Sequence, residues 1–499
     1  MSEVRLPQLA WHGPRELELP LPDDWQVEIC HMAGFDQPAL KPEEIQASIA
    51  HPLGLPPLRE LARGRREVVI LFDDLTRVTR VAKLLPFVLS ELAEAGLSDG
   101  QIRLVAALGC HGAMSRLDLA KKLGEAVLAR FPVYNHNPFD NCDYVGTTRL
   151  GTKLFINQEV MSCDLKIGIG SIVPHPLTGF GGGGKIVLPG VSSLETTEAF
   201  HRLEAQVREK YPDGIIGMGR FAHNPLRREV EEAAKLASLD VKIDCLVNEW
   251  GEPTSIFAGA LELAYAAGVQ RAKEHYLSPR AEDKDVVLVN SFAKASEAII
   301  ALEAAFPAVS RQGGDVVLIC NAPEGQVVHY LIGSFGRKAG SRVKVRAKVP
   351  RNVNHLIVYT QYPELAARDN PQRCEAVGVN VRRHQLVAIV IAAFFAGVAG
   401  VLFVVLERSV FPDLLFWILS LEIFIMCLLG GWFTFTGPIL GAAIMVALRT
   451  FVGQYTEYWT LILGVILILL IFFLPQGVMG YVQGKLSPRV KEASEGGSK

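Results

Sequence analysis

A long run nearly free of charge, in the C-terminal part of the chain, most constrains what this sequence can fold into. Between Leu386 and Leu474 only six of 89 residues are charged, whereas charges are spread throughout the 385 residues before it. The segment Leu386–Leu406 holds 21 uncharged residues, which is enough for one helix to cross the hydrocarbon core of a bilayer. The chain therefore combines two compositions, and we exclude a wholly soluble protein.

Three further apolar segments lie in the same run, at residues 414–432, 438–452 and 458–474. Together with the first segment they predict an all-α membrane part of about four spanning helices. Lys and Arg residues flank this part on both sides, which places both of its ends in the cytoplasm by the positive-inside rule. We expect the chain to reside in the inner or plasma membrane, with the residues before this part in the cytoplasm.

The charge balance argues against nucleic acid as a partner. The chain has 50 Lys and Arg residues against 52 Asp and Glu residues, a formal net charge of −2. Such a balance creates no basic field of the kind that nucleic-acid-binding domains use. The eight cysteines include no CxxC pair, which favours a reduced compartment.

The first part of the chain alternates between strand-like and helix-like segments. Short apolar runs predict strands at residues 68–72, 102–108, 165–169, 286–289, 316–319 and 355–359. Helical spacing follows at residues 81–97, 115–130 and 194–210, and from Lys294 onward. This alternation predicts an α/β fold with largely parallel sheets, in which ligands bind at the carboxyl ends of the strands. The alternation pauses between residues 252 and 285, where we place a domain boundary.

The most unusual motif is a glycine-rich loop that ends in a lysine. Residues 175–186 read His-Pro-Leu-Thr-Gly-Phe-Gly-Gly-Gly-Gly-Lys-Ile, and Gly179 to Lys185 satisfies the first seven places of a phosphate-binding P-loop. Two features argue against that interpretation. Ile186 has no hydroxyl for Mg²⁺, and the segment 186–190 is strand-like and stopped by a proline, where a P-loop opens a helix. The consecutive glycines instead predict a backbone that approaches a bulky ligand closely, with amides free to bind an anion.

Three histidines complete the candidate site. His111 and His175 each follow a predicted strand, and His201 falls in the predicted helix 194–210. A lone histidine is more often a hydrogen-bonded structural residue than a catalytic one. Three that converge on a lysine-bearing loop favour a site for proton transfer or for binding a transition metal.

Taken in order, these motifs resemble those of the lactate racemase family, which uses a nickel-pincer nucleotide cofactor. The matching segments are Asp73-Asp74-Leu75-Thr76-Arg77, Gly109-Cys110-His111-Gly112, Pro174-His175-Pro176, the glycine-lysine loop and His201. The resemblance covers roughly residues 10–360. It implies a two-domain α/β architecture, with a catalytic domain at residues 1–270 and a truncated second α/β domain at residues 271–363.

The resemblance also implies a role for each residue of the site. Lys185 would carry the covalent link to the pyridinium-type cofactor, and His201 would be a protein ligand to nickel. His111 and His175 would be the two acid/base residues on opposite faces of the substrate. The remaining cofactor-binding residues would be Asp73, Thr76, Arg77, Gly181, Gly182, Gly183 and Gly184.

The implied substrate is a 2-hydroxy acid similar to lactate, racemised by hydride transfer to the cofactor. Hydride transfer avoids the carbanion that proton removal would create beside a carboxylate, and two bases serve the two enantiomers. Arg77 or Arg80 could hold the substrate carboxylate or a cofactor phosphate, with a surface ion pair as the alternative, and Lys294 is a further substrate-binding candidate. Residues 290–294 depart from the Asn-Gly-Gly-type segment of a true lactate racemase, which leaves a different 2-hydroxy acid or a sugar acid open.

The C-terminal part resembles a different family, the membrane-spanning subunit of branched-chain amino-acid ABC transporters. The matching segments are residues 367–373, 375–381 and 430–442. This resemblance implies a permease-like domain at residues 364–487, followed by a polar tail at residues 488–499. It also implies that the charged segment 368–384 docks on an ABC ATPase subunit.

Two functions from different classes follow. The first is a nickel-pincer-dependent isomerase, with the membrane part incidental or an anchor in the lipid bilayer. The second is a transport subunit that carries a racemase-like soluble part. We favour the enzyme, because every residue of its predicted site is present, whereas the permease resemblance lacks the N-terminal half of that family.

Overall fold

The computed structural model describes residues 2–211, 214–331, 349–362, 381–407, 417–431, 436–454, 464–465 and 477–479. Its contacts divide the chain into two compact units, at residues 1–385 and 386–499. The boundary between these units coincides with the start of the nearly uncharged run. Each unit is described by itself below.

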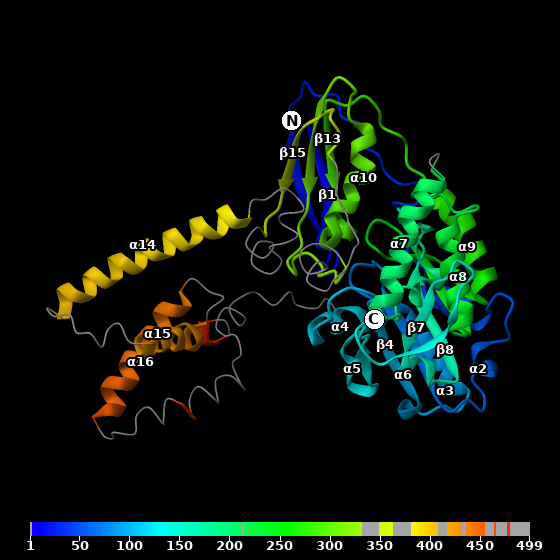
Figure 1. Ribbon diagram of the computed structural model, residues 1–499, viewed down its shortest axis with the longest axis horizontal. Coiled ribbons are helices and arrows are strands. Elements are labelled where there is room, and N and C mark those ends of the chain that lie inside the picture. Colours follow the sequence, from blue (N-terminus) through cyan, green and yellow to red (C-terminus); the bar gives the residue numbers. More distant parts are fainter. Residues whose placement is uncertain are drawn as a thin grey trace, which may run out of the picture. The chain divides into compact units, whose positions relative to one another are not determined.

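A six-stranded sheet forms the centre of the first unit (Figure 1). Its strands lie in the order β12 (Pro253–Gly259), β11 (Val241–Val247), β8 (Leu165–Ser171), β3 (Val68–Asp73), β4 (Ile102–Ala107) and β5 (Val133–Asn135). All neighbours are parallel except the edge strand β12, which runs antiparallel to β11. We call this sheet and the helices around it the first lobe.

Helices cover both faces of this sheet, as its continuous apolar strands require. Alternate residues of β3 point to opposite faces. Ile70 packs with α1 (Pro42–Ala50) and α3 (Val81–Glu94) on one face, in a core that includes Ile45, Leu84 and Val88. Leu71 packs on the other face against residues of α6 (Gln158–Met161), the 3₁₀ helix η2 (Gly183–Ile186) and α8 (Pro225–Leu236).

The strand order reverses direction beside β3. From β3 the chain proceeds to β4 and β5 on one side, and β8 and β11 then add on the other side. Such a switch point opens a crevice at the carboxyl ends of the two central strands, where α/β proteins bind ligands. The segments that follow β3 and β8 carry Arg77 and His175, so the fold brings predicted site residues to this crevice.

A second, smaller parallel sheet forms the second lobe. Its strands lie in the order β13 (Val286–Asn290), β14 (Gly314–Ile319) and β15 (Val353–Tyr359), with the helical segments η3 (Phe292–Ala301), α10 (Leu302–Ala305) and η4 (Phe306–Ala308) packed on it. An N-terminal hairpin, β1 (Ser2–Gln8) and β2 (Arg15–Leu21), joins this lobe. Gln8 contacts Asn290 and Asn321 there, at distances of 3.0 and 2.9 Å.

The chain therefore crosses between the lobes twice. The first crossing follows β2, and the second follows α9 (Leu261–His275). The two crossing segments are tied together, because the amides of Ala33 and Gly34 donate to the carbonyls of Leu277 and His275 at 2.7 and 2.9 Å.

The alternation of strands and helices is confirmed, with three corrections. The predicted pause at residues 252–285 is wrong, because β12 and α9 lie there. β12 is an edge strand of mixed composition, Pro-Thr-Ser-Ile-Phe-Ala-Gly, and α9 is rich in alanine, so neither shows strong apolar periodicity. The predicted helix 115–130 is two helices, α4 (Arg116–Leu123) and α5 (Glu125–Arg130), divided at Gly124 with φ of +86°. The strand-like segment 186–190 instead continues η2 into turns.

The second unit contains helices at three of the four predicted apolar segments. They are α14 (Val381–Glu407), which begins just before the unit boundary, α15 (Trp417–Gly430) and α16 (Gly437–Gly453). α15 and α16 pack closely through Leu429 and Met445. The fourth segment, residues 458–474, falls almost wholly outside the described residues.

In the part of the chain that the structure describes, none of the helices combines the length and the hydrophobicity that crossing a membrane requires. The prediction of membrane spans is therefore not confirmed.

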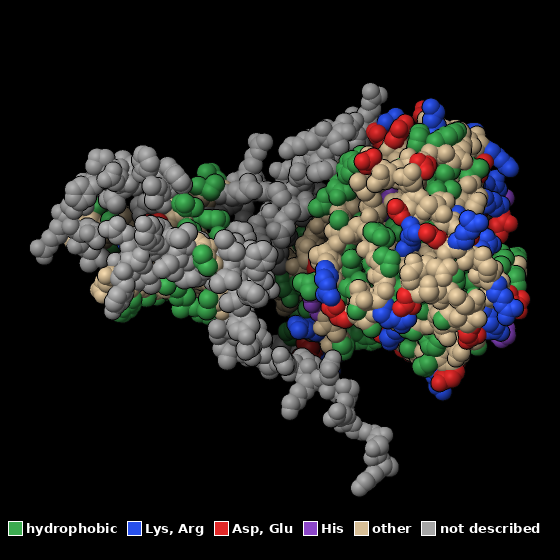
Figure 2. Space-filling model, turned by 90° about the horizontal axis from the view of Figure 1, so that it is seen from below, with side chains coloured by type: hydrophobic (Ala, Val, Ile, Leu, Met, Phe, Trp, Pro, Cys, Tyr) green, Lys and Arg blue, Asp and Glu red, His purple; other side chains and the backbone are tan. Residues whose placement is uncertain are grey.

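In the view of Figure 2, Lys and Arg side chains are interspersed with Asp and Glu side chains over the first unit.

A buried lysine holds the loop that follows β3. The side chain of Lys122, on α4, is fully buried, and its ammonium donates to the carbonyls of Asp74 and Arg77, both at 2.9 Å. It also pairs with Asp73 Oδ1 at 2.6 Å. Burial lowers the pKa of Lys122, and the carboxylates of Asp73 and Asp74 partly offset this shift. One buried cation thus fixes the position of the loop that carries these site residues.

We expect Lys122→Met to lower the free energy of unfolding of the first unit by about 3–5 kcal/mol, because it leaves the carboxylate of Asp73, which is only 13% exposed, without its cation. Chemical unfolding followed by circular dichroism measures the change. Arg116→Met, on the same helix, is the control, because Arg116 pairs with Glu125 in solvent and exposed pairs contribute little. Equal stability of the two variants would contradict the assigned role of Lys122.

Candidate active site

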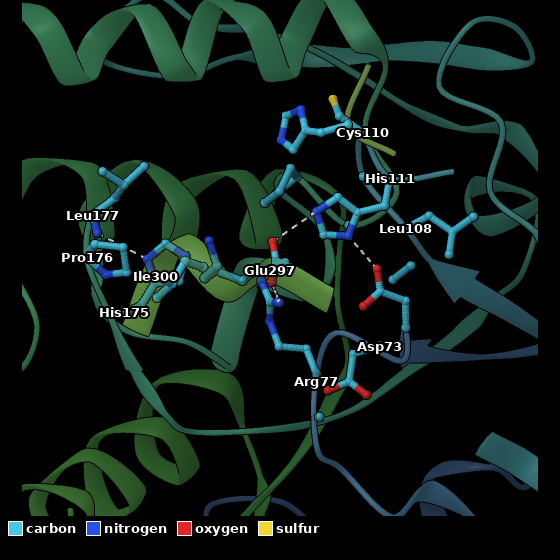
Figure 3. Close-up of a pocket in the computed structure, with 18 of the residues that line it drawn as sticks. Asp73, Arg77, Leu108, Cys110, His111, His175, Pro176, Leu177, Glu297 and Ile300 are labelled. Carbon is cyan, nitrogen blue, oxygen red and sulfur yellow. Dashed lines mark hydrogen bonds and ion pairs between the residues drawn. The ribbon is translucent and has the colours of Figure 1, made fainter. Parts of the chain in front are cut away.

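One large cavity, of about 880 Å³, lies at the switch point of the first sheet and is lined by both lobes. Loops after β3, β4 and β8 supply one side of it, and η3 and the segment around residue 329 supply the other. The ionisable side chains on its lining include Asp73, Asp74, Arg77, His111, His175, Lys185, His201, Lys242, Glu297, Glu303 and His329. Figure 3 shows His111 and His175 on either side of Glu297.

The Nδ1 atom of His111 contacts the carboxylate of Asp74. This nitrogen lies 2.5 Å from Asp74 Oδ2, and the other oxygen of Asp74 accepts from the hydroxyl and the amide of Thr76, at 2.5 and 2.9 Å. Burial alone would raise the pKa of Asp74, but the charges and hydrogen bonds of His111, Arg77 and Thr76 hold it well below its usual range. The carboxylate of Asp74 therefore stays ionised and holds Nδ1 of His111, and Nε2 is the ring nitrogen on the side of Glu297.

His175 has the opposite tautomer. It lies on β9 (Pro174–His175), which pairs with β10 (Gly179–Phe180), and its Nδ1 accepts from the amide of Leu177 at 3.1 Å. The proton of the neutral imidazole is therefore on Nε2. Burial, with the cations of Lys185, Arg77 and Lys294, lowers the pKa of His175 well below its ordinary value, so the ring is neutral at physiological pH.

Lys185 reaches the cavity from η2. Burial lowers the pKa of its ammonium well below the ordinary value, and the cations of Arg77, Arg227 and Lys294 lower it further. This environment favours the uncharged amine, which is the form in which a lysine is a nucleophile.

The glycines before Lys185 serve mainly to pack the loop against the protein. A Cβ on Gly183 would lie 2.1 Å from Arg227 Nη2, and one on Gly184 would lie 2.6 Å from a backbone oxygen of Val230. The amide of Gly183 donates to Asp244 at 2.8 Å, so it is not free for an anion. Of the four glycines, only Gly182 lines the cavity. The sequence predicted amides free to bind an anion, and the amide of Gly183 is not free.

Three imidazoles line one end of the cavity. His201, on α7 (Leu194–Lys210), has a pKa lowered to about 4, first by burial and then by Lys185 and His111. Its ring lies 6.1 Å from that of His329, which in turn lies 5.4 Å from that of His111. Among the residues that the structure describes, no three or more His, Cys, Asp or Glu side chains gather as a metal-binding group.

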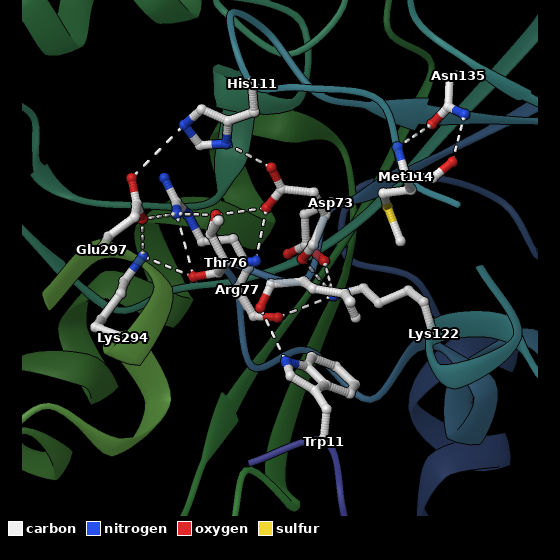
Figure 4. Close-up of polar contacts among 12 residues, drawn as sticks. Trp11, Asp73, Thr76, Arg77, His111, Met114, Lys122, Asn135, Lys294 and Glu297 are labelled. Atoms are coloured by element: carbon white, nitrogen blue, oxygen red, sulfur yellow. Dashed lines mark hydrogen bonds and ion pairs between the residues drawn. The ribbon is translucent and has the colours of Figure 1, made fainter. Parts of the chain in front are cut away.

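A cluster of opposite charges on the lining centres on Glu297. Glu297 Oε2 accepts from Arg77 Nη1 and from Lys294 Nζ, each at 2.9 Å, and Glu297 Oε1 lies 3.6 Å from His111 Nε2 (Figure 4). Burial alone would raise the pKa of Glu297, but Lys294, Arg77 and His111 hold it well below its usual range. Glu297 is therefore an ionised carboxylate beside the candidate base.

The structure brings most of the predicted residues to one cavity. Its lining includes Asp73, Arg77, His111, His175, Gly182, Lys185 and His201. It does not include Thr76, Gly181, Gly183, Gly184 or Lys294, although Thr76 and Lys294 contact residues that line it. Arg80 bonds to the carbonyls of Ala10 and Trp250 instead.

Five ionisable residues of the lining were not predicted as site residues: Asp74, Lys242, Glu297, Glu303 and His329. Asp74 lies inside a motif that was noticed, Glu297 lies three residues after Lys294, and His329 follows a strand of the second sheet. The signal for Glu297 was its i, i+3 spacing from a candidate cation. His329 could have been found as a polar residue beyond the carboxyl end of β14.

Two family models match separate parts of the chain. Residues 12–211 match the lactate racemase N-terminal domain, and residues 365–471 match the permease component of the branched-chain amino acid transport system. Both resemblances seen in the sequence are thereby confirmed.

Similar proteins divide in the same way. The lactate racemase of Thermoanaerobacterium thermosaccharolyticum is 28% identical over 295 residues, which are 58% of this chain and 67% of that protein. The lactate racemase of Lactiplantibacillus plantarum is 29% identical over 290 residues, which are 57% of this chain and 66% of that protein. The branched-chain amino acid permease protein LivM of Escherichia coli is 31% identical over 121 residues, 24% of this chain and 28% of its own. The chain thus spans about two thirds of these racemases and less than a third of the permease.

A solved structure is similar to the first unit. The lactate racemase apoprotein from Thermoanaerobacterium thermosaccharolyticum superposes with a TM-score of 0.56 at 22% identity, over 72% of this chain and 88% of that chain. A protein from Thermotoga maritima gives a TM-score of 0.52 at 20% identity, over 68% and 91%. At these identities the likeness establishes the fold.

Proposed function

We propose that the first unit is an isomerase that racemises or epimerises a 2-hydroxy acid, with His111 and His175 as its acid/base residues. The observation that carries the proposal is that both imidazoles line one cavity together with Arg77 and Lys185. The similarity to lactate racemases supports a lactate-like substrate.

The residues of the cavity fit the nickel-pincer nucleotide that the family implies. Lys185 presents a buried amine with a depressed pKa, which covalent attachment through nitrogen requires. His201 is neutral above pH of about 4 and can donate a ring lone pair to a metal. Because the described residues gather no metal-binding group of their own, further donors would have to come from the cofactor. When bound, the cofactor would supply the carbon that accepts a hydride from the substrate and returns it.

The protein's own residues would then bind the substrate and move its hydroxyl proton. Arg77 would hold the substrate carboxylate, which leaves the hydroxyl within reach of the Nε2 lone pair of His111. Asp74 would stabilise the imidazolium that forms when His111 takes the proton. His175, across the cavity, carries its proton on Nε2 and would donate it to the ketone oxygen as the opposite enantiomer forms. In the reverse direction the neutralised His175 would take the hydroxyl proton and His111 would return one.

Lys185→Ala should abolish the covalent cofactor, because no amine remains at the attachment point. Intact mass spectrometry of protein produced with the cofactor-synthesis enzymes and nickel measures this. Lys294→Ala is the matched control, because that amine is engaged with Glu297 and with the carbonyl of Thr76 and should leave the added mass in place. A covalent cofactor on the Lys185→Ala protein would disprove the assignment.

Loss of either acid/base imidazole should slow racemisation by about 10²–10⁴-fold. Chiral chromatography of a panel of 2-hydroxy acids, from lactate to sugar acids, measures the rate for His111→Asn and His175→Asn and identifies the substrate. His12→Asn, which removes an imidazole outside the cavity, should retain the wild-type rate. Wild-type rates in both site variants would exclude the proposed roles.

A second candidate function rests on the permease match over residues 365–471. We propose that this part attaches the chain to the inner or plasma membrane, with the first unit in the cytoplasm. The possible docking segment for an ABC ATPase, residues 368–384, lies mostly outside the described residues.

This membrane proposal predicts that the full chain sediments with the membrane fraction and remains there after an alkaline carbonate wash, because integral spans resist extraction. Immunoblotting of the pellet and the supernatant measures the distribution. A known peripheral protein of the same membrane is the control and should be released. Recovery of the chain in the soluble fraction would contradict membrane attachment.

A further inference from the structure

Glu297 occupies the position that a substrate needs. A 2-hydroxy acid presents a carboxylate, which requires a cation, and a hydroxyl on the next carbon, which requires a base. Glu297 Oε2 lies between Arg77 and Lys294, and Glu297 Oε1 lies 3.6 Å from His111 Nε2. One side chain of the protein thus fills the subsite for the carboxylate and approaches the site of the hydroxyl (Figures 3 and 4).

We propose that Glu297 is an internal competitor of the substrate, and that a 2-hydroxy acid binds by displacing its carboxylate from Arg77 and Lys294. The proposal rests on the function assigned above, and it makes Glu297 a determinant of substrate affinity. Two carboxylates cannot occupy the space between these cations, because both cations already converge on a single oxygen of Glu297.

Both cations would keep their positions when Glu297 leaves. Arg77 Nη1 also donates to Thr76 Oγ1 at 2.6 Å, and Lys294 Nζ donates to the carbonyl of Thr76 at 2.7 Å. These contacts remain in place without Glu297. The two cations therefore form a prepared anion site, and Glu297 supplies its negative charge while no ligand is bound.

The backbone around Glu297 is suited to such a movement. Within η3, Lys294 (φ −118°, ψ 21°) and Glu297 (φ −131°, ψ 43°) both depart from helical geometry, so the segment is not a continuous helix. A shift of the backbone at such an interruption can move the Glu297 side chain away without breaking a regular ladder of hydrogen bonds.

Glu297 is not needed to join the two lobes. The indole of Trp11 donates to the carbonyl of Leu75 at 2.9 Å, the amide of Gly112 donates to Val328 at 3.0 Å, and the amide of Tyr330 donates to Cys110 at 2.8 Å. These three contacts connect the lobes independently of Glu297. Displacement of the carboxylate therefore leaves the cavity assembled.

The test is calorimetric titration of the cofactor-free full chain with oxamate, an unreactive carboxylate that resembles a 2-hydroxy acid. We expect Glu297→Gln to bind oxamate about tenfold more tightly than the wild type, because a neutral amide competes less for the two cations. Glu324→Gln is the matched control. It removes a carboxylate that pairs with His12 and Lys121 and is not on the cavity lining, and it should leave the affinity unchanged.

A second substitution guards against misfolding. Glu297→Asp retains the charge on a shorter side chain and should bind oxamate with an affinity between those of the wild type and Glu297→Gln. Equal or weaker binding by both Glu297 variants would overturn the proposal, as would the absence of oxamate binding in all the proteins. If the protein racemises a 2-hydroxy acid but the three affinities do not follow this order, the enzyme function stands and the role of Glu297 as a competitor is wrong. If the affinities follow this order but no racemisation is detected, the role of Glu297 stands and the enzyme function is wrong.

Discussion

The geometry of the site depends on one buried cation beneath the loop after β3. Lys122 binds the carboxylate of Asp73 and the backbone carbonyls of Asp74 and Arg77, and thereby holds the loop that carries these three side chains. Asp74 in turn orients His111, and Arg77 in turn holds Glu297 of the second lobe. A buried ammonium is costly unless every donor is satisfied. The loop satisfies this one with its own backbone, so the stability of the lobe and the position of the site rest on the same contacts.

Much of the first lobe could be predicted from sequence, because its signals are local. The helix 194–210 ends at the residues expected, and β3 differs from its prediction by one residue. The failures occur where local signals are weak. The edge strand β12 and the alanine-rich α9 carry little periodicity, and Gly124 divides a helix through a backbone conformation that spacing does not reveal.

The site was predictable where its residues follow strands of one sheet, and not where they come from the other lobe. His111, His175 and Lys185 follow strands of the first sheet, whose common edge was expected to bind a ligand. Glu297 and His329 reach the cavity only because the second lobe packs on the first, and no pattern in the sequence specifies how two lobes meet. The glycine loop shows a second limit of prediction from sequence. Its composition indicated close approach, but the partner of that approach is largely Arg227 and Tyr265 rather than a ligand.

The double crossing between the lobes limits how they can move. Residues 33–34 and 275–277 run side by side and are hydrogen-bonded to each other, so the two covalent connections act as a single pivot. A relative movement of the two lobes would turn about this pivot. Glu297 and His329 both belong to the second lobe, so they would move together with respect to His111 and Arg77.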